Sequence, residues 1–177
     1  AYEISLGLVG SEMRIRDSAR SEQIHDGQIE VESFAAHHYL LTPMPVEDNP
    51  MRNMQQIMQH LQSAWEHSSY KAGCGSYISL EKALQGQFDV YDGVFTPVDP
   101  QDDDSLFLLR PAGQYLCGYS VGSWDKLPEL YSHMIAYAKK HHLALTGNCY
   151  EIGLNEFAIS RPEEYVARVS ILIDPKQ

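Results

Sequence analysis

The chain has 177 residues, 44% of them hydrophobic, which is enough for one domain with a sizeable core. It carries 13 lysines and arginines against 24 aspartates and glutamates, a net charge of −11. An acidic surface repels phosphate backbones, so this composition argues against direct nucleic-acid binding, and no apolar run reaches the length of a membrane span.

The cysteines and the N-terminus indicate a cytoplasmic protein. Cys74, Cys117 and Cys149 are odd in number and lack C-x-x-C spacing, which predicts reduced thiols. No signal-peptide pattern precedes them. The chain begins at Ala1, which fits either removal of an initial methionine or a fragment of a longer protein.

The first half of the chain predicts strands around one long helix. Residues 1–28 are expected to be a lead-in segment with a short strand over 4–9, and residues 28–42 to form a strand with an irregularity at Ala35–Ala36. After the prolines of 43–50 a helix is expected, and strands over 73–80 and 88–98 follow. The apolar residues expected to share one face of this helix are Met51, Met54, Ile57, Met58, Leu61 and Trp65.

The second half predicts the same order of elements. The acidic run 100–104 reads as a solvated join between the halves. A long strand over 106–121, broken near 111–113, precedes a helix that begins at Ser123, and strands over 147–154 and up to Asp174 end the domain. The helix has an amphipathic spacing on Leu127, Leu130, Tyr131, Met134, Ile135 and Ala138.

These two halves resemble each other in sequence as well as in layout. Residues 73–80 read GCGSYISL and residues 147–154 read GNCYEIGL, and both segments follow a helix and precede a charged loop and a strand. The pattern predicts an α+β domain over 29–177, built from duplicated β-α-β-β units over 29–100 and 105–175. The units would form an antiparallel sheet with two long helices on one face and a ligand cleft at the pseudo-two-fold.

The repeat is broken by one acid, because Tyr77 of the first segment aligns with Glu151 of the second. A carboxylate between apolar neighbours on a strand is costly unless it has a role. Side chains alternate along a strand, so Tyr150, Ile152 and Leu154 share one face. We expect this apolar set to face the helices and Glu151 to face a cleft on the other side, together with Tyr77.

The second half resembles the GyrI-like effector-binding domain, the ligand-sensing C-terminal module of MerR-type transcription regulators. The resemblance rests on a Gly-x-aromatic turn at Gly122 and Trp124, on Gly147, on the pair Tyr150-Glu151 and on Tyr165 in the last strand. It extends over roughly 29–175. The lead-in 1–28 resembles the segment that follows the dimerising helix in such regulators, so a DNA-binding domain would belong to a longer protein.

The resemblance implies a ligand site around Glu151. In this family the matching glutamate attracts lipophilic cations, and aromatic rings around it add cation–π attraction. The small Gly153 would leave space beside the carboxylate. The candidate walls are Trp124, Tyr77, Tyr39, Phe107 and Tyr165.

Other chemistries find less support in the sequence. Gly118–Gly122 (GYSVG) matches the nucleophile-elbow pattern around Ser120, but that motif belongs on a parallel sheet, and this sheet is predicted to be antiparallel. The eight histidines do not form a zinc-binding pattern. Haem is bound by the related SOUL domain, but no cofactor or metal is expected here.

Three functions remain open at this level. The first is a sensor of a small, cationic, aromatic molecule within a transcription regulator, without membrane association. The second is a stand-alone GyrI-like hydrolase that uses Glu151 as a general base. The third is a protein-binding module of the gyrase-inhibitor kind, which would use the acidic surface.

Overall fold

The computed structural model describes residues 23–44, 50–68, 72–98, 106–155 and 159–175. The predicted strand over 4–9, most of the lead-in 1–28 and the acidic join 100–104 lie outside these residues. No helix in the described ranges is long and apolar enough to cross a membrane.

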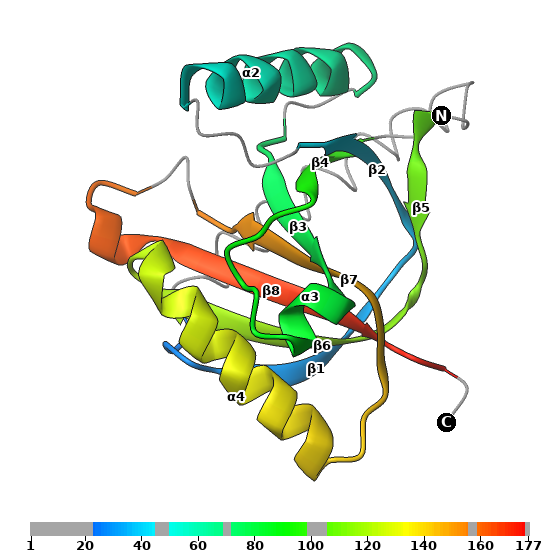
Figure 1. The fold of residues 1–177 in the computed structure, drawn as a ribbon, viewed down its shortest axis with the longest axis vertical. Coiled ribbons are helices and arrows are strands. Elements are labelled where there is room, and N and C mark those ends of the chain that lie inside the picture. The colour runs from blue at the N-terminus through cyan, green and yellow to red at the C-terminus, as the bar shows by residue number, and fades with distance from the viewer. Residues whose placement is uncertain (1–22, 45–49, 69–71, 99–105, 156–158, 176–177) are drawn as a thin grey trace.

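The described chain is an α+β fold around one antiparallel sheet of eight strands, in the order β1-β6-β8-β7-β3-β4-β2-β5 (Figure 1). The strands are β1 (Ile29–Phe34), β2 (His37–Pro43), β3 (Gly75–Ser79), β4 (Gly93–Val98), β5 (Leu108–Arg110), β6 (Gly113–Val121), β7 (Leu145–Gly153) and β8 (Val166–Ile173). The helices are α2 (Pro50–Glu66), α3 (Leu80–Leu84) and α4 (Leu127–Lys140), with short 3-10 turns η2 (Trp124–Lys126) and η3 (Pro162–Glu164).

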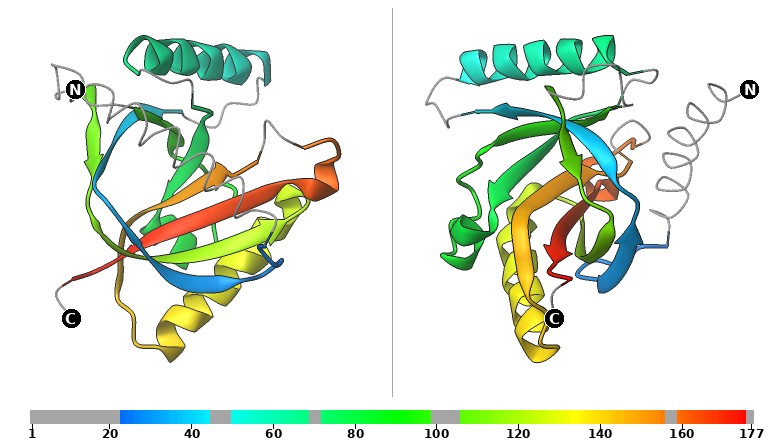
Figure 2. Two further views of the ribbon diagram at one scale, coloured as in Figure 1. Left: turned by 180° about the vertical axis from the view of Figure 1, so that it is seen from behind. Right: turned by 90° about the vertical axis from the view of Figure 1, so that its right-hand side faces the viewer.

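Two bent segments, β1–β2 and β5–β6, give the sheet its curvature. The predicted irregularity at Ala35–Ala36 separates β1 from β2, and the predicted break near 111–113 separates β5 from β6. The two segments pair with each other on both sides of their bends. β1 pairs with β6, with Ile29 opposite Gly118, and β2 pairs with β5, with Tyr39 opposite Leu108. Because β1 and β5 stand at opposite ends of the strand order, this pairing makes the sheet curl strongly (Figure 2).

Helix α4 packs on one face of the sheet as its periodicity predicts. The residues that it buries are Leu127, Leu130, Tyr131, Met134 and Ala138. They join a cluster that includes Ile78 of β3, Cys149 of β7 and Val169 of β8. We call this side of the sheet the helix face.

Helix α2 covers another part of the helix face, over β2 and β4. His60 is 3% exposed, and its ring nitrogens lie 2.7 Å from Oγ1 of Thr42 and 2.9 Å from Oγ1 of Thr96. The register of the strands shows that this is the face on which α4 packs. Thr96 and Val94 share one side of β4, and Val94 pairs with Ser76 of β3. Ser76 pairs in turn with Glu151, which lies on the same side of β7 as Cys149 in the α4 cluster. The prediction of two long helices on one face of an antiparallel sheet is therefore correct.

The apolar side of α2 does not face the sheet. Met51, Met54 and Met58, which were expected on one face of the helix, are 71%, 56% and 55% exposed. The sheet beneath the helix presents threonine hydroxyls, so the polar His60 and the small Ala64 face it instead.

The opposite side of the sheet, the aromatic face, has its own core. Tyr39, Tyr77, Phe95 and Tyr150 form one cluster there, and Tyr115, Cys117 and Tyr119 belong to a second. The guanidinium carbon of the buried Arg110 lies 4.4 Å from the ring centre of Phe34 and 4.6 Å from that of Tyr115.

Candidate functional site

Glu151 is a fully buried carboxylate on the helix face. It is 0% exposed and belongs to β7. Tyr131 of α4 donates a hydrogen bond of 2.7 Å to Oε1, and Tyr91, in the segment before β4, donates one of 2.9 Å to Oε2. Two tyrosine hydroxyls from distant parts of the chain therefore converge on one acid.

The alternation along β7 and its register with β3 direct Glu151 toward the helices. Cys149 and Glu151 occupy the same side of β7, and Cys149 packs into the core beneath α4. The strand position opposite Glu151 is Ser76, whose small side chain leaves room above the sheet. Gly75 beside it has no side chain, and a Cβ there would lie 2.1 Å from the carbonyl oxygen of Glu151.

The segment that carries Tyr91 is held in place by contacts of the next residue, Asp92. The backbone N–H of Ser79 donates a hydrogen bond of 2.7 Å to Oδ2 of Asp92, and Lys82 forms an ion pair of 2.5 Å with Oδ1. In the same segment Phe88 stacks on Tyr131, with ring centres 5.1 Å apart and an interplanar angle of 16°. The segment Phe88–Asp92 therefore forms a cover over Glu151, and we use the term "cover" for these residues below.

Burial makes the ionised form of Glu151 costly. Desolvation raises the pKa of Glu151 to about 7, although the hydrogen bonds from Tyr131 and Tyr91 act to lower it. Desolvation and the neighbouring carboxylate raise the pKa values of both tyrosines, which keeps their hydroxyls protonated as donors. In the described part of the chain, no lysine, arginine or histidine forms an ion pair with Glu151.

The expected direction of Glu151 is wrong. We expected Tyr150 and Ile152 to face the helices, but they pack with Tyr39, Tyr77 and Phe95 on the aromatic face. This face offers a large aromatic core to an apolar side chain, and the two tyrosine hydroxyls offset the cost of burying the acid on the helix side.

Two predicted walls of the site lie on the other side of the sheet, which corrects the expectation that they share a cleft with Glu151. Tyr77 is paired with Tyr150, not with Glu151, and their ring centres are 6.4 Å apart. Tyr39 accepts a hydrogen bond of 2.9 Å from Nη1 of Arg110. An arginine inside this cluster makes the aromatic face unfavourable for a second cation.

A third predicted wall, Phe107, packs elsewhere on the helix face. It lies with Ala64 and Val98, beneath the C-terminal end of α2, and its ring is 5.6 Å from that of His67. No contact with Glu151 brings it to the site in the described structure.

The other predicted residues lie together on the same side of the sheet as Glu151. Gly153 follows Glu151 by two positions on β7, and a Cβ at Gly153 would come within 2.3 Å of the hydroxyl oxygen of Tyr165. The ring of Tyr165 lies 5.4 Å from that of Trp124, which is 44% exposed. The hydroxyl of Tyr165 thus fills the space over Gly153, and the ring pair Tyr165–Trp124 extends from there to the surface. We call these three residues the aromatic path.

The immediate neighbours of the carboxylate were missed in the sequence. Tyr131 was predicted only as a core residue of its helix, and Phe88 and Tyr91 only as parts of a strand. A buried acid requires donors, but the sequence did not indicate which of the 11 tyrosines, or which other polar side chain, would reach it.

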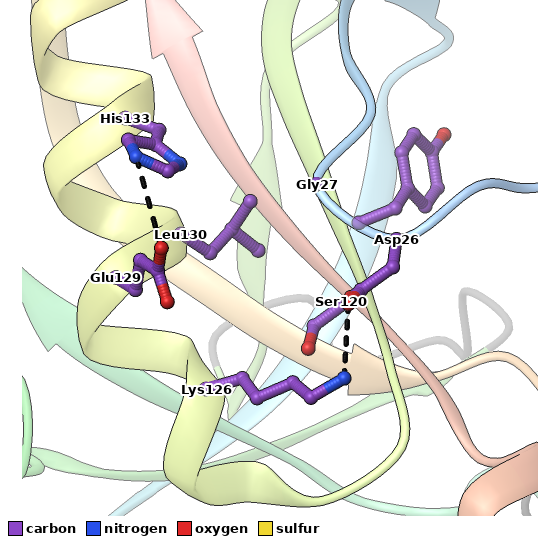
Figure 3. Close-up of a pocket in the computed structure, with 8 residues that line it drawn as sticks. Asp26, Gly27, Ser120, Lys126, Glu129, Leu130 and His133 are labelled. Carbon is purple, nitrogen blue, oxygen red and sulfur yellow. Dashed lines mark hydrogen bonds and ion pairs between the residues drawn. The ribbon is translucent and has the colours of Figure 1, made fainter.

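A separate surface pocket of about 210 Å³ lies between the first half of α4 and the start of the described chain (Figure 3). It is lined by Asp26, Gly27, Tyr119, Ser120, Lys126, Glu129, Leu130 and His133. Lys126 is already paired with Asp26 at 2.9 Å, and both side chains are about half exposed, so water screens their charges. The charges in this pocket are thus paired and screened, whereas the carboxylate of Glu151 is buried.

Ser120 of the G-x-S-x-G pattern lines this pocket, but it is not part of a catalytic triad. Its hydroxyl oxygen has no hydrogen-bond partner among the described residues. His133 lies instead 4.0 Å from Oε1 of Glu129, and the sheet around Ser120 is antiparallel, as predicted (Figure 3).

Comparison with known proteins identifies a family for most of the chain. The model of the GyrI-like small molecule binding domain matches residues 36–174. The C-terminal domain of EcmrR is similar in structure, with a TM-score of 0.59 and 12% identity over 84% of this chain and 98% of that one.

Two further solved structures share the fold. The EcmrR–DNA complex has a TM-score of 0.60 and 12% identity, and covers 94% of this chain and 68% of that one. An uncharacterized conserved protein from Listeria innocua has a TM-score of 0.55 and 12% identity, over 88% of this chain and 96% of that one. No curated protein matches the chain.

Proposed function

The chain belongs to the GyrI-like small-molecule-binding family, and from this premise we propose that it is a sensor that binds a lipophilic, aromatic cation at Glu151. The observation that carries the proposal is a fully buried carboxylate that has two tyrosine hydroxyls as partners and no basic residue among the described ones. A delocalised cation would supply the missing charge.

Binding at this carboxylate requires the cover to move. Glu151 has no exposed surface, and Phe88 and Tyr91 of the cover lie against Tyr131 and against Glu151 itself. The cover follows a turn at Gln85–Gly86, where Gly86 has a φ of 78°, and Val90 within it is 40% exposed. A planar cation that displaced Phe88 would stack on Tyr131 and reach the carboxylate.

The aromatic path formed by Gly153, Tyr165 and Trp124 is the proposed continuation of the site. A ligand that extends along β7 past Gly153 would meet the ring of Tyr165 and then the half-exposed Trp124. Contacts with ring faces have little directional preference, so such a site would accept several cations of similar size.

We further propose that ligand binding acts on transcription through a DNA-binding domain outside this chain. The fold is shared with a protein solved in complex with DNA, and the acidic chain itself is poorly suited to DNA. A ligand that binds only the state with the cover displaced would shift the equilibrium toward that state, which a linked domain can read.

One observation favours the hydrolase alternative. The pKa of Glu151, raised to about 7 by desolvation, matches that of an effective general base near neutral pH. Under this alternative the same opening of the cover would admit an electrophilic substrate and a water molecule, and Glu151 would take a proton from the water.

The decisive experiment is a titration of the purified chain with rhodamine 6G, followed by the fluorescence of the dye. The wild type is expected to bind saturably, and Glu151→Gln is expected to weaken binding by about tenfold or more, which corresponds to roughly 1.4 kcal/mol. The matched control is Glu163→Gln, an exposed residue that loses the same charge.

Either of two results would refute the cation sensor: no saturable binding by the wild type, or equal affinities for wild type and Glu151→Gln. If affinity is unchanged but hydrolysis of a reactive ester or epoxide is lost in Glu151→Gln, the hydrolase is correct. If neither property depends on Glu151, the acidic surface becomes the candidate for a protein-binding function.

A further inference from the structure

Helix α2 carries an apolar stripe that faces away from the protein. Met51, Met54 and Met58 are 71%, 56% and 55% exposed. The helix lies along one end of the molecule, and no other coloured helix or strand lies on the side of it that faces away from the sheet (Figures 1 and 2). Three large apolar side chains in one row on a single helix form a patch of the kind found at protein interfaces.

The helix is turned with its polar side inward. His60 and Ala64 face the sheet, and His60 is held between Thr42 and Thr96. The buried histidine therefore fixes the rotation of α2 about its axis and presents the methionines to the outside.

The spacing of the apolar residues is that of a coiled-coil seam. Positions 51, 54, 58, 61 and 65 follow the alternating steps of three and four that place the a and d residues of heptads on one side of a helix. Leu61 is half-buried, and the indole Nε1 of Trp65 donates a hydrogen bond of 2.9 Å to the carbonyl oxygen of Ala72. The open part of the seam thus runs from Met51 to Leu61.

We propose that a second copy of this chain covers the seam, with the two α2 helices antiparallel about a two-fold axis. In an antiparallel pair each a residue faces a d residue, so Met51 would face Leu61 of the second copy, and Met54 would face Met58. The two-fold then repeats both contacts, which gives four apolar layers from one self-complementary surface.

The charges of the helix fit a copy of itself. The chain has a net charge of −11, yet α2 contains only Arg52 and Glu66, one of each sign. The other exposed residues of α2 include the uncharged Gln55, Gln59 and Gln62. Two acidic molecules can therefore approach along α2 without like charges facing each other.

Sedimentation equilibrium over a wide concentration range tests the proposal. The wild type is expected to form a reversible dimer, and Met54→Glu to raise its dissociation constant by about tenfold or more, because the two-fold places two new carboxylates in the seam. Gln59→Glu adds the same charge to an exposed position of α2 outside the seam, and is expected to change the dissociation constant by less than about threefold.

Disulfide cross-linking tests the direction of the helices. In a Cys74→Ser background, a mixture of Met54→Cys and Met58→Cys chains is expected to form the mixed disulfide faster than either variant forms one with itself. A wild type that stays monomeric at all concentrations, or a dimer equally weakened by Met54→Glu and Gln59→Glu, would overturn the interface. Faster self-disulfides would overturn the antiparallel arrangement.

Discussion

Tyr131 donates a hydrogen bond of 2.7 Å to Glu151, and both side chains are 0% exposed. The bond joins α4 to the central strand β7 through the interior of the protein. It connects the buried carboxyl group of Glu151 to the helix that covers it, so the stability of the fold and the properties of the site are coupled.

Removal of this hydroxyl should destabilise the protein in a pH-dependent way. Tyr131→Phe leaves an ionised Glu151 with Tyr91 as its remaining donor, so the free energy of unfolding is expected to fall by about 1.5–3 kcal/mol above pH 7. Below pH 6 the carboxyl is largely protonated and the loss should be smaller.

Urea unfolding at pH 5.5 and pH 8 measures both values. Tyr137→Phe, on the same helix, is the matched control, since the hydroxyl of Tyr137 has no hydrogen-bond partner among the described residues and its removal is expected to change stability little. Equal losses for Tyr131→Phe at the two pH values would contradict an ionised Glu151.

Glu151 should make the free energy of unfolding depend on pH. Its pKa rises from 4.5 to about 7 on folding because of desolvation, so the folded state binds more protons than the unfolded state between these values. The contribution is therefore fully present below pH 4.5 and is lost as the pH rises to 7, by roughly 3 kcal/mol in all.

Thermal unfolding of the wild type and Glu151→Gln across pH 4–8 should reveal this contribution as a difference that grows up to pH 7 and then stays constant. The exposed Glu163→Gln should track the wild type throughout. A difference that is flat across the whole range would mean that the carboxyl has an ordinary pKa in the folded state.

His60 should change the free energy of unfolding with pH in the opposite direction to Glu151, over an overlapping pH range. Desolvation lowers its pKa from 6.5 to about 4, so the unfolded state binds more protons in this interval and stability increases with pH. The contribution is present above pH 6.5 and is lost as the pH falls to 4. In the wild type the two effects should partly cancel between pH 4.5 and 6.5.

A His60→Gln variant should therefore lose stability more steeply than the wild type as the pH rises from 4.5 to 6.5, because the decline due to Glu151 is no longer compensated. Chemical denaturation at several pH values in this range would measure the slopes. His133→Gln, which changes an exposed histidine on α4, serves as the control and should preserve the wild-type slope. Parallel slopes for His60→Gln and the wild type would argue that His60 titrates normally.

The close approach of β3 to β7 should make Gly75 intolerant of a side chain. A Cβ at this position would lie 2.1 Å from the carbonyl oxygen of Glu151, and a backbone atom can move only if the strands separate. Gly75→Ala is expected to cost about 3 kcal/mol or more, at the upper end of overpacking effects.

The control for this prediction is Gly113→Ala, where the nearest atom is the side-chain Cδ1 of Leu172 at 3.2 Å. This methyl group can rotate away, so the loss of stability should be about 1 kcal/mol or less. Melting temperatures of the two variants would compare the sites directly, and similar values would show that β3 and β7 separate easily.

The order of the elements could be predicted from the amino-acid sequence, and so could the unusual position of Glu151 within the internal repeat. The β-rich segments with their breaks near residues 35 and 111, and the core face of α4, follow from local periodicity and turn chemistry. These features depend on neighbours within a few positions along the chain, which the sequence displays. Glu151 was singled out because it breaks the internal repeat, and the structure buries it.

The tertiary structure decided which way the elements face. Alternation along β7 shows that Glu151 and Tyr150 lie on opposite sides, but only the packing of Tyr150 against the aromatic face fixes which side is which. For the same reason α2 turned His60 inward and its methionines outward. The donors to Glu151 come from 20 and 60 residues away, and such distant pairs are set by the packing of the whole sheet, not by any local pattern.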